Sequence, residues 1–119
     1  MTIRREDVEA GRVDFGDMVD PAAPMLPPVH PGEILKEEFL APLGMSVYAL
    51  AAALQVPRTR LNDIVLGRRS VTAETALRLA KYFGTSADFW MGLQAQYDLD
   101  VARRTFGAEV DRQVTPRAA

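Results

Sequence analysis

Apolar residues recur at helical spacing between residues 31 and 105, and this pattern predicts a series of short helices. Pro31 suits a first helical position, and the first segment ends before Gly44. The apolar residues of this segment are Ile34, Leu35, Phe39 and Leu40. Ser46 is a natural N-cap for a second helix and Thr72 for a fourth.

The third and fifth helices are marked by breakers and caps of their own. Pro57 opens the third helix and Gly67 ends it. Thr85 with Asp88 three residues later forms a capping box for the fifth helix. No stretch alternates as a strand would, so the sequence predicts an all-α fold, a bundle of about five helices joined by short loops.

The two ends of the chain lack this periodicity. Residues 1–29 contain six acids against three bases and scattered Gly and Pro, which predicts an extended or partly disordered N-terminal arm. The apolar periodicity of residues 106–119 is similarly weak, and these residues are expected to form a flexible C-terminal tail. The folded domain is therefore expected to cover residues 30–105.

Composition excludes several classes of protein. The chain has 119 residues, 48% of them hydrophobic and 25% charged, as in one ordinary soluble domain. It has no cysteine, so disulfides and Cys-ligated zinc are excluded. The one histidine, His30, precedes Pro31 and fits a helix cap better than a general base. We expect a cytoplasmic protein that is not an enzyme, binds no cofactor or metal and does not span a membrane.

Charge is distributed unevenly along the chain. The formal net charge is −2, which argues against a nucleic-acid binder when taken alone. Residues 1–56 carry nine acids and four bases (−5), residues 57–81 two acids and six bases (+4), and residues 82–119 five acids and four bases (−1). Positive charge is thus concentrated in the third and fourth predicted helices.

Only Gln55-Val56-Pro57 separates the second and third predicted helices, which is the spacing of a helix-turn-helix. In that motif the second helix enters the DNA major groove. Arg, Asn and Thr recognise guanine, adenine and the thymine methyl group, whereas an acid is tolerated only opposite a cytosine amino group. The candidates on the exposed face of the third helix are Arg58, Thr59, Arg60, Asn62 and Asp63.

Phosphate contacts are expected from residues outside this face. Arg68 and Arg69 follow the Gly67 stop on a loop and suit phosphates better than bases. Ser46 and Thr72 begin two helices whose backbone N–H groups could bind phosphates.

Several segments closely resemble the HigA (VapI-like) antitoxins, a branch of the Xre/Cro–C1 helix-turn-helix proteins. The resemblance covers roughly residues 29–105. The segments that carry it include His30-Pro31-Gly32-Glu33, Val56-Pro57-Arg58-Thr59-Arg60-Leu61, Leu66-Gly67-Arg68-Arg69, Thr72-Ala73-Glu74-Thr75-Ala76-Leu77 and Phe89-Trp90-Met91-Gly92-Leu93-Gln94.

The resemblance implies a lambda-repressor-like bundle of five helices that dimerises and binds double-stranded DNA at a palindromic operator in its own promoter. It further implies neutralisation of a small HigB/RelE-like ribonuclease toxin. By position, Arg58 to Asp63 become the recognition helix, with Arg68 and Arg69 on the DNA backbone.

Alternatives remain open at this stage. The chain could be a free-standing Xre-family transcriptional regulator without a toxin, or a toxin-neutralising protein with weak DNA binding. The arm could place Arg4 and Arg5 in a minor groove, fold onto a basic toxin, or stay solvated. Part of the aromatic stripe on the fifth helix must cover the core, but two adjacent aromatics cannot both face inward on one helix. The stripe therefore suggests a homodimer interface, with packing in the core alone as the alternative. The candidate interface residues are Phe89, Trp90, Leu93 and Tyr97.

Overall fold

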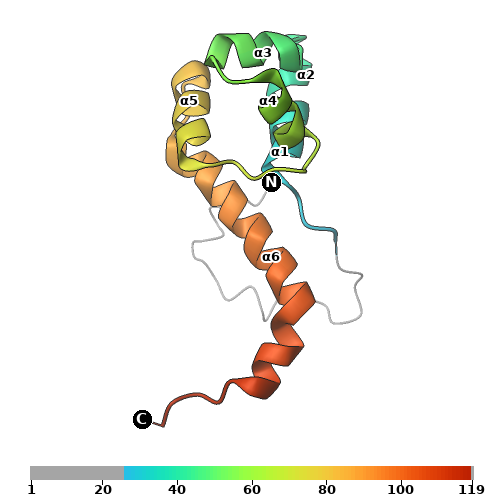
Figure 1. Cartoon of the computed structure of the whole chain (residues 1–119), viewed down its shortest axis with the longest axis vertical. Coiled ribbons are helices and arrows are strands. Elements are labelled where there is room, and N and C mark those ends of the chain that lie inside the picture. The colour runs from blue at the N-terminus through green and yellow to red at the C-terminus, as the bar shows by residue number, and fades with distance from the viewer. Residues whose placement is uncertain (1–25, 119) are drawn as a thin grey trace.

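In the computed structural model, which describes residues 26–118, five helical segments are present and the last projects from the other four as a stem (Figure 1). The first segment is continuous and consists of α1 (Pro31–Ile34), the π-helical turns η2 (Leu35–Leu40) and α2 (Ala41–Leu43). The others are α3 (Val47–Leu54), α4 (Arg58–Val65), α5 (Ala73–Phe83) and α6 (Ala87–Gln113). The all-helical prediction is confirmed, and no strand occurs between residues 26 and 118.

Helix ends follow the sequence signals in most places. The Ser46 hydroxyl accepts a hydrogen bond from the Ala49 N–H at 3.0 Å and caps α3. The Thr72 hydroxyl accepts from the Thr75 N–H at 3.3 Å and caps α5. Gly84 ends α5 in the left-handed region at φ 74°, where a residue without Cβ is favoured.

The predicted cap of α6 is wrong by one residue. Ser86, not Thr85, is the N-cap, and its hydroxyl accepts from the Phe89 N–H at 3.0 Å. The Thr85 hydroxyl instead accepts the indole N–H of Trp90 at 2.8 Å. Because the Trp90 ring is fully buried, its N–H needs a partner inside the protein, and Thr85 supplies it.

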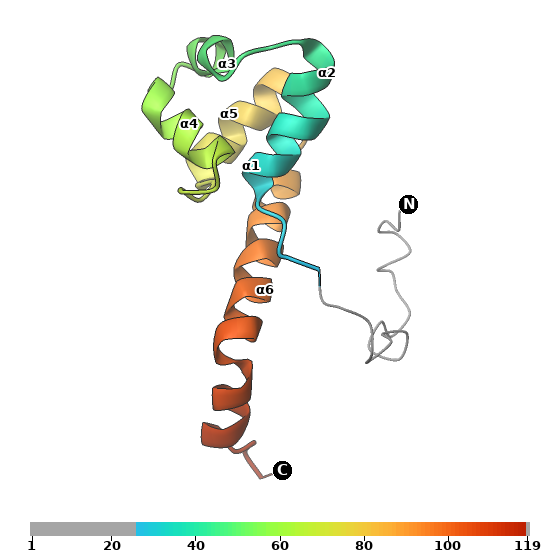
Figure 2. The ribbon, with the colours of Figure 1, turned by 90° about the vertical axis from the view of Figure 1, so that its right-hand side faces the viewer.

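The predicted C-terminal boundary of the domain is also wrong. Helix α6 continues to Gln113, so residues 106–113 are helical, and of the described residues only 114–118 of the predicted tail are irregular. Gly107 costs a helix about 1 kcal/mol relative to Ala, but it does not end α6. Of the predicted arm 1–29, residues 1–25 lie outside the described residues. Residues 26–29 are non-helical and lead along α6 to α1 (Figure 2).

Apolar side chains from all five segments form one core. Its largest fully buried members are Trp90, Leu35, Leu50, Leu61, Ile64 and Leu79. The Trp90 ring lies 5.0 Å from the Phe39 ring and 6.5 Å from that of Phe83, measured between centroids. Trp90 is therefore the centre of the monomer core, and its assignment to a dimer interface is wrong.

The first turn of α1 lies directly against the last turn of α4. A Cβ placed on Gly32 would be 1.8 Å from the carbonyl oxygen of Ile64, so only glycine permits this approach. The N-cap of α1 is His30, whose Nδ1 accepts a hydrogen bond from the Gly32 N–H at 2.9 Å. The expectation that His30 is a helix cap is confirmed.

The described residues contain neither a membrane-spanning helix nor a metal cluster. Between residues 26 and 118 no single helix is long and apolar enough to cross a membrane, and one pair that passes jointly, Pro31–Leu43 with Val47–Leu54, is bent by 99°. In the same part of the chain no three His, Asp or Glu side chains are grouped to hold a metal ion.

Replacing Gly32 with Ala should strongly destabilise the protein, because the new methyl group would overlap the Ile64 backbone. We expect the free energy of unfolding to fall by about 3 kcal/mol or more, as for severe overpacking of a core. Denaturant titration followed by circular dichroism measures this change.

Gly107→Ala is the matched control, since Gly107 is also helical but has no atom within 4 Å of the added Cβ. It should leave stability unchanged or raise it by about 1 kcal/mol. Equal effects of the two substitutions would show that the contact between α1 and α4 does not constrain the fold.

Candidate nucleic-acid interface

Helices α3 and α4 form the predicted helix-turn-helix. Gln55 ends α3 in the left-handed region at φ 58°, which turns the chain sharply. Val56 then packs into the core with 8% of its surface exposed, and α4 begins at Arg58. A left-handed residue other than glycine costs roughly 1–2 kcal/mol, so the buried contacts on both sides hold the turn in place.

Helix α4 has one buried and one exposed face. Leu61 and Ile64 are 0% and 1% exposed and attach the helix to the core. Arg58, Thr59 and Asn62 lie on the exposed face, while Arg60 and Asp63 are half-buried at its edges. Figure 2 shows α4 at one side of the group of shorter helices, apart from the projecting end of α6. The structure therefore brings together side chains that can donate to base edges.

Asp63 is less of an obstacle to DNA than its charge suggests. Its carboxylate lies 3.8 Å from the Arg68 guanidinium, and its backbone carbonyl accepts from the Arg68 N–H at 2.8 Å. Both side chains are partly exposed, so this ion pair is weak, but it turns Asp63 toward the loop that follows α4.

The loop from Leu66 to Val71 places Arg68 and Arg69 on the surface beside α4. Its far end is fixed by Gln94 of α6, a residue that is 4% exposed. The Gln94 side-chain oxygen accepts from the Val71 N–H at 2.7 Å, and its NH₂ group donates to Asp98 at 2.9 Å. A buried N–H that lost this partner would carry the cost of desolvation, so Gln94 holds the loop in position.

The other end of the loop packs on His30. A Cβ placed on Gly67 would lie 3.7 Å from the imidazole of His30, so this glycine is close to the ring. The His30 ring also meets the Tyr97 ring edge-on at 4.8 Å. Burial lowers the pKa of His30 below its ordinary 6.5, and Asp98 and the Arg69 carbonyl offset part of that shift. Neutral His30 thus connects α1 and α6 with the loop from Leu66 to Val71, called the arginine loop below.

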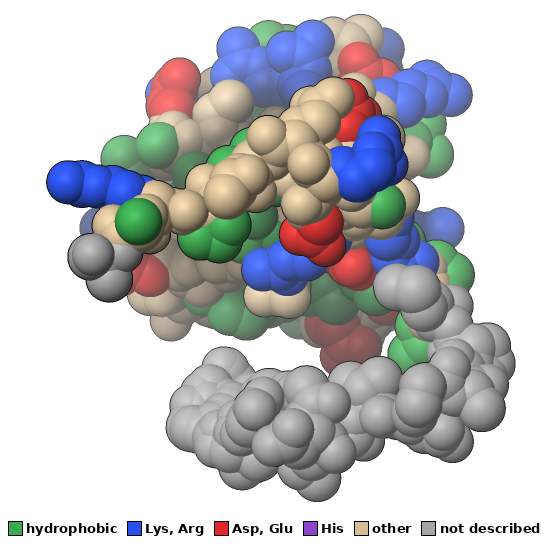
Figure 3. Space-filling view, turned by 90° about the horizontal axis from the view of Figure 1, so that it is seen from below, with side chains coloured by type: hydrophobic (Ala, Val, Ile, Leu, Met, Phe, Trp, Pro, Cys, Tyr) green, Lys and Arg blue, Asp and Glu red, His purple; other side chains and the backbone are tan. Residues whose placement is uncertain are grey.

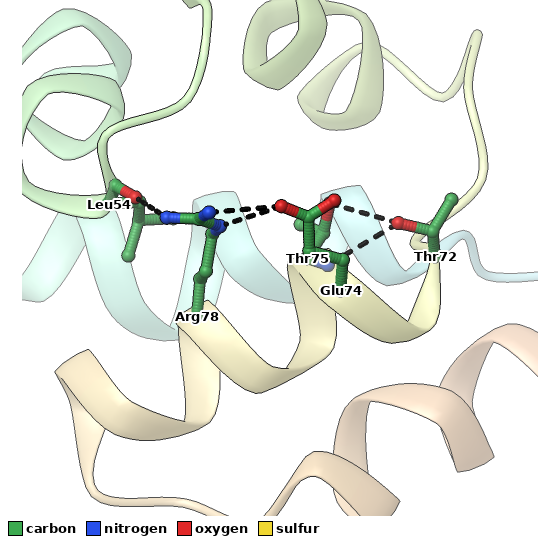
Figure 4. Close-up of polar contacts among 5 residues, drawn as sticks. All are labelled: Leu54, Thr72, Glu74, Thr75 and Arg78. Atoms are coloured by element: carbon green, nitrogen blue, oxygen red, sulfur yellow. Dashed lines mark hydrogen bonds and ion pairs between the residues drawn. The ribbon is translucent and has the colours of Figure 1, made fainter.

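Arg78 adds to the positive charge of this region, but its contacts stabilise the fold. Its guanidinium donates to Glu74 one turn earlier at 3.0 and 3.2 Å, and to the Leu54 carbonyl at the end of α3 at 3.0 Å (Figure 4). The sequence did not indicate that Arg78 and Gln94 hold neighbouring segments in place. The i,i+4 spacing of Glu74 and Arg78 signals their pairing, whereas only a polar residue at a core-facing position hints at Gln94.

The side chains of Ser46 and Thr72 are used as caps, as described above. A contribution of either residue to phosphate binding would come from the backbone N–H groups of α3 and α5 behind them.

The predicted dimer residues on α6 do not form one exposed face. Beside the buried Trp90, Leu93 packs on the core and Tyr97 on His30, and Phe89 is 40% exposed. A different face of α6 exposes Leu99, Phe106 and Val110, each at least half exposed.

These features define a helix-turn-helix domain, and the comparisons with known proteins agree. A family model described as Helix-turn-helix matches residues 35–90. Virulence-associated protein I of Dichelobacter nodosus is 52% identical over 79 residues, which are 66% of this chain and 73% of that protein. Antitoxin HigA-1 of Vibrio cholerae is 38% identical over 82 residues, 69% of this chain and 77% of that protein.

A solved structure of the Pseudomonas aeruginosa antitoxin HigA with the higBA promoter has a TM-score of 0.75 and 45% identity to this chain. The match covers 76% of this chain and 99% of that one. The chain therefore belongs to the family of helix-turn-helix proteins that includes the HigA antitoxins and the VapI-like virulence-associated proteins.

Stability should fall as the pH drops from about 7 through the lowered pKa of His30. Below the ordinary value of 6.5 the unfolded chain takes up a proton that the folded chain resists, because burial of His30 disfavours the charged imidazolium. The free energy of unfolding, measured across this range, should decline more for the native chain than for His30→Asn, which keeps a capping acceptor but does not titrate.

Carboxylates titrate in both proteins, so the difference between the two curves isolates His30. Parallel curves would contradict the assignment, as would a native chain that gains stability relative to His30→Asn on acidification.

Proposed function

We propose that this protein is the DNA-binding antitoxin of a type II toxin–antitoxin pair, acting in the cytoplasm. As a homodimer it represses its own operon at a palindromic operator, and it neutralises a small HigB/RelE-like ribonuclease toxin. The observation that carries the proposal is the 45% identity to a HigA antitoxin solved with its promoter, extending over 99% of that chain.

The geometry of α4 and its loop supports DNA binding. The exposed donors Arg58 and Asn62 match the bidentate patterns of guanine and adenine in the major groove. Arg69 and Arg68 lie on the loop just beyond the recognition helix, where they suit phosphates. The backbone N–H groups at the starts of α3 and α5 add further phosphate donors.

Helix α6 offers a better dimer interface than the one predicted from sequence. Ala95, Leu99, Ala102, Phe106 and Val110 follow one another at intervals of four, three, four and four residues, which places them on one side of the helix. The view up the stem shows hydrophobic side chains exposed among acidic and basic ones (Figure 3). We propose that this stripe, called the α6 stripe below, packs against the same stripe of a second copy.

DNA binding should depend steeply on salt. The logarithm of the association constant for the DNA upstream of the gene should fall linearly with the logarithm of salt concentration, by about 0.9 per neutralised phosphate. Arg69→Ala should lower this slope by about 1 per protomer and weaken binding evenly across sequences. Fluorescence anisotropy at several salt concentrations measures both quantities.

The toxin half of the proposal has its own test. Co-expression with the small reading frame adjacent to the gene should relieve that frame's toxicity, and the two products should co-purify. A neighbour that is harmless alone would favour a free-standing regulator. Rescue without salt-dependent DNA binding would favour a protein that only neutralises a toxin.

Phe106→Glu should dissociate the homodimer, because it places a charge in the middle of the α6 stripe. Its side chain is 54% exposed in the monomer, so the fold should survive. We expect the dissociation constant of the dimer to rise at least tenfold in sedimentation equilibrium, about 1.4 kcal/mol. Leu77→Glu on α5, where the native side chain is 63% exposed, is the control and should leave the dimer intact. An unchanged dimer in Phe106→Glu would place the interface elsewhere.

A further inference from the structure

The helix before the recognition helix carries one polar side chain. Helix α3 reads Val-Tyr-Ala-Leu-Ala-Ala-Ala-Leu, so Tyr48 is its only residue with a polar group beyond the backbone. Tyr48 lies in the first turn and is 63% exposed. The other exposed residues of this helix are alanines, so the contacts of the Tyr48 ring are of interest.

Its contact is with the first residue of α4. The guanidinium carbon of Arg58 lies over the Tyr48 ring, 4.8 Å from the ring centroid. This distance is within the range of a cation–π interaction. The ring therefore joins the first helix of the helix-turn-helix to the residue best placed to enter the groove.

We infer that Tyr48 is a positioning residue that holds Arg58 ready to read a guanine. This inference rests on the proposed DNA binding and goes beyond it. An exposed arginine has many rotamers, and each base contact requires that one of them be selected. A guanidinium stacked on a ring has one face covered while its N–H edges stay free to donate, and those edges make the bidentate contact to guanine O6 and N7.

The position of Tyr48 suits this role in the complex as well. The first helix of a helix-turn-helix crosses the DNA backbone while the second lies in the groove. A ring at the start of α3 therefore stays beside the phosphates and does not occupy the groove itself. Stacking requires the ring and not the hydroxyl, so phenylalanine should substitute for tyrosine.

The experiment uses the full-length protein and duplexes selected from a randomised DNA pool with the native chain. Competition binding then compares the selected duplex with duplexes changed at one base pair at a time. Arg58→Ala identifies the base pair that Arg58 reads, because discrimination at that pair alone should be lost.

Tyr48→Ala should reduce discrimination at the same base pair about three- to fivefold, the range of an exposed cation–π contact, while leaving the other positions unchanged. Tyr48→Phe should retain it. The double variant Tyr48→Ala/Arg58→Ala should discriminate no less than Arg58→Ala alone, since Tyr48 acts through Arg58. Tyr82→Ala is the control: Tyr82 is a half-exposed tyrosine of α5 that contacts Met45 and Phe83, and its loss should leave discrimination intact.

A Tyr48→Ala protein with native discrimination at the Arg58 position would overturn the inference while leaving the proposed function standing. Uniform weakening at every position would also overturn it, because Tyr48 would then be a general backbone contact. A native chain that selects no sequence from the pool would overturn both proposals together.

Discussion

The backbone of Gly32 against the carbonyl of Ile64 is the contact on which the proposed DNA-binding surface depends. It sets the distance between the start of α1 and the end of α4, where the chain leaves the proposed recognition helix for the arginine loop, which carries Arg68 and Arg69. His30 caps α1 through Gly32 and packs on Gly67 on the other side, so one short motif positions two neighbouring segments. The His-Pro-Gly-Glu segment therefore holds α4 and the loop after it in position.

The arginines of this region differ in what their side chains contact. Arg78 is tied to Glu74 and to the Leu54 carbonyl, and so it braces α5 against α3. Arg68 lies near Asp63 and offsets part of its negative charge. Arg58 instead stacks on Tyr48 at the exposed end of α4. Counting bases along the sequence locates the basic region correctly but does not separate these three uses.

The sequence predicts most of the fold because short-range signals mark its helices. Caps at Ser46 and Thr72 and the tight connection around Val56 all hold in the structure. Trp90 could not be placed this way, since adjacent aromatics compete for one inward position and only tertiary packing decides between them. The length of α6 was not predicted because residues 106–119 lack a clear apolar period, yet the helix continues to Gln113. The long-range contact of Gln94 with Val71 leaves only a weak local signal, a polar residue at a core-facing position, which does not name its partner.

Protection of the DNA upstream of the gene tests the central claim most directly. A symmetric dimer with one recognition helix per protomer should protect two half-sites about 34 Å apart, one turn of the duplex, on the same face of the DNA. Hydroxyl-radical footprinting resolves this pattern. We expect two equivalent protected half-sites related by a palindrome. A single protected half-site, or no protection at protein concentrations that saturate binding, would contradict the assignment of α4 as the recognition helix of a dimeric repressor.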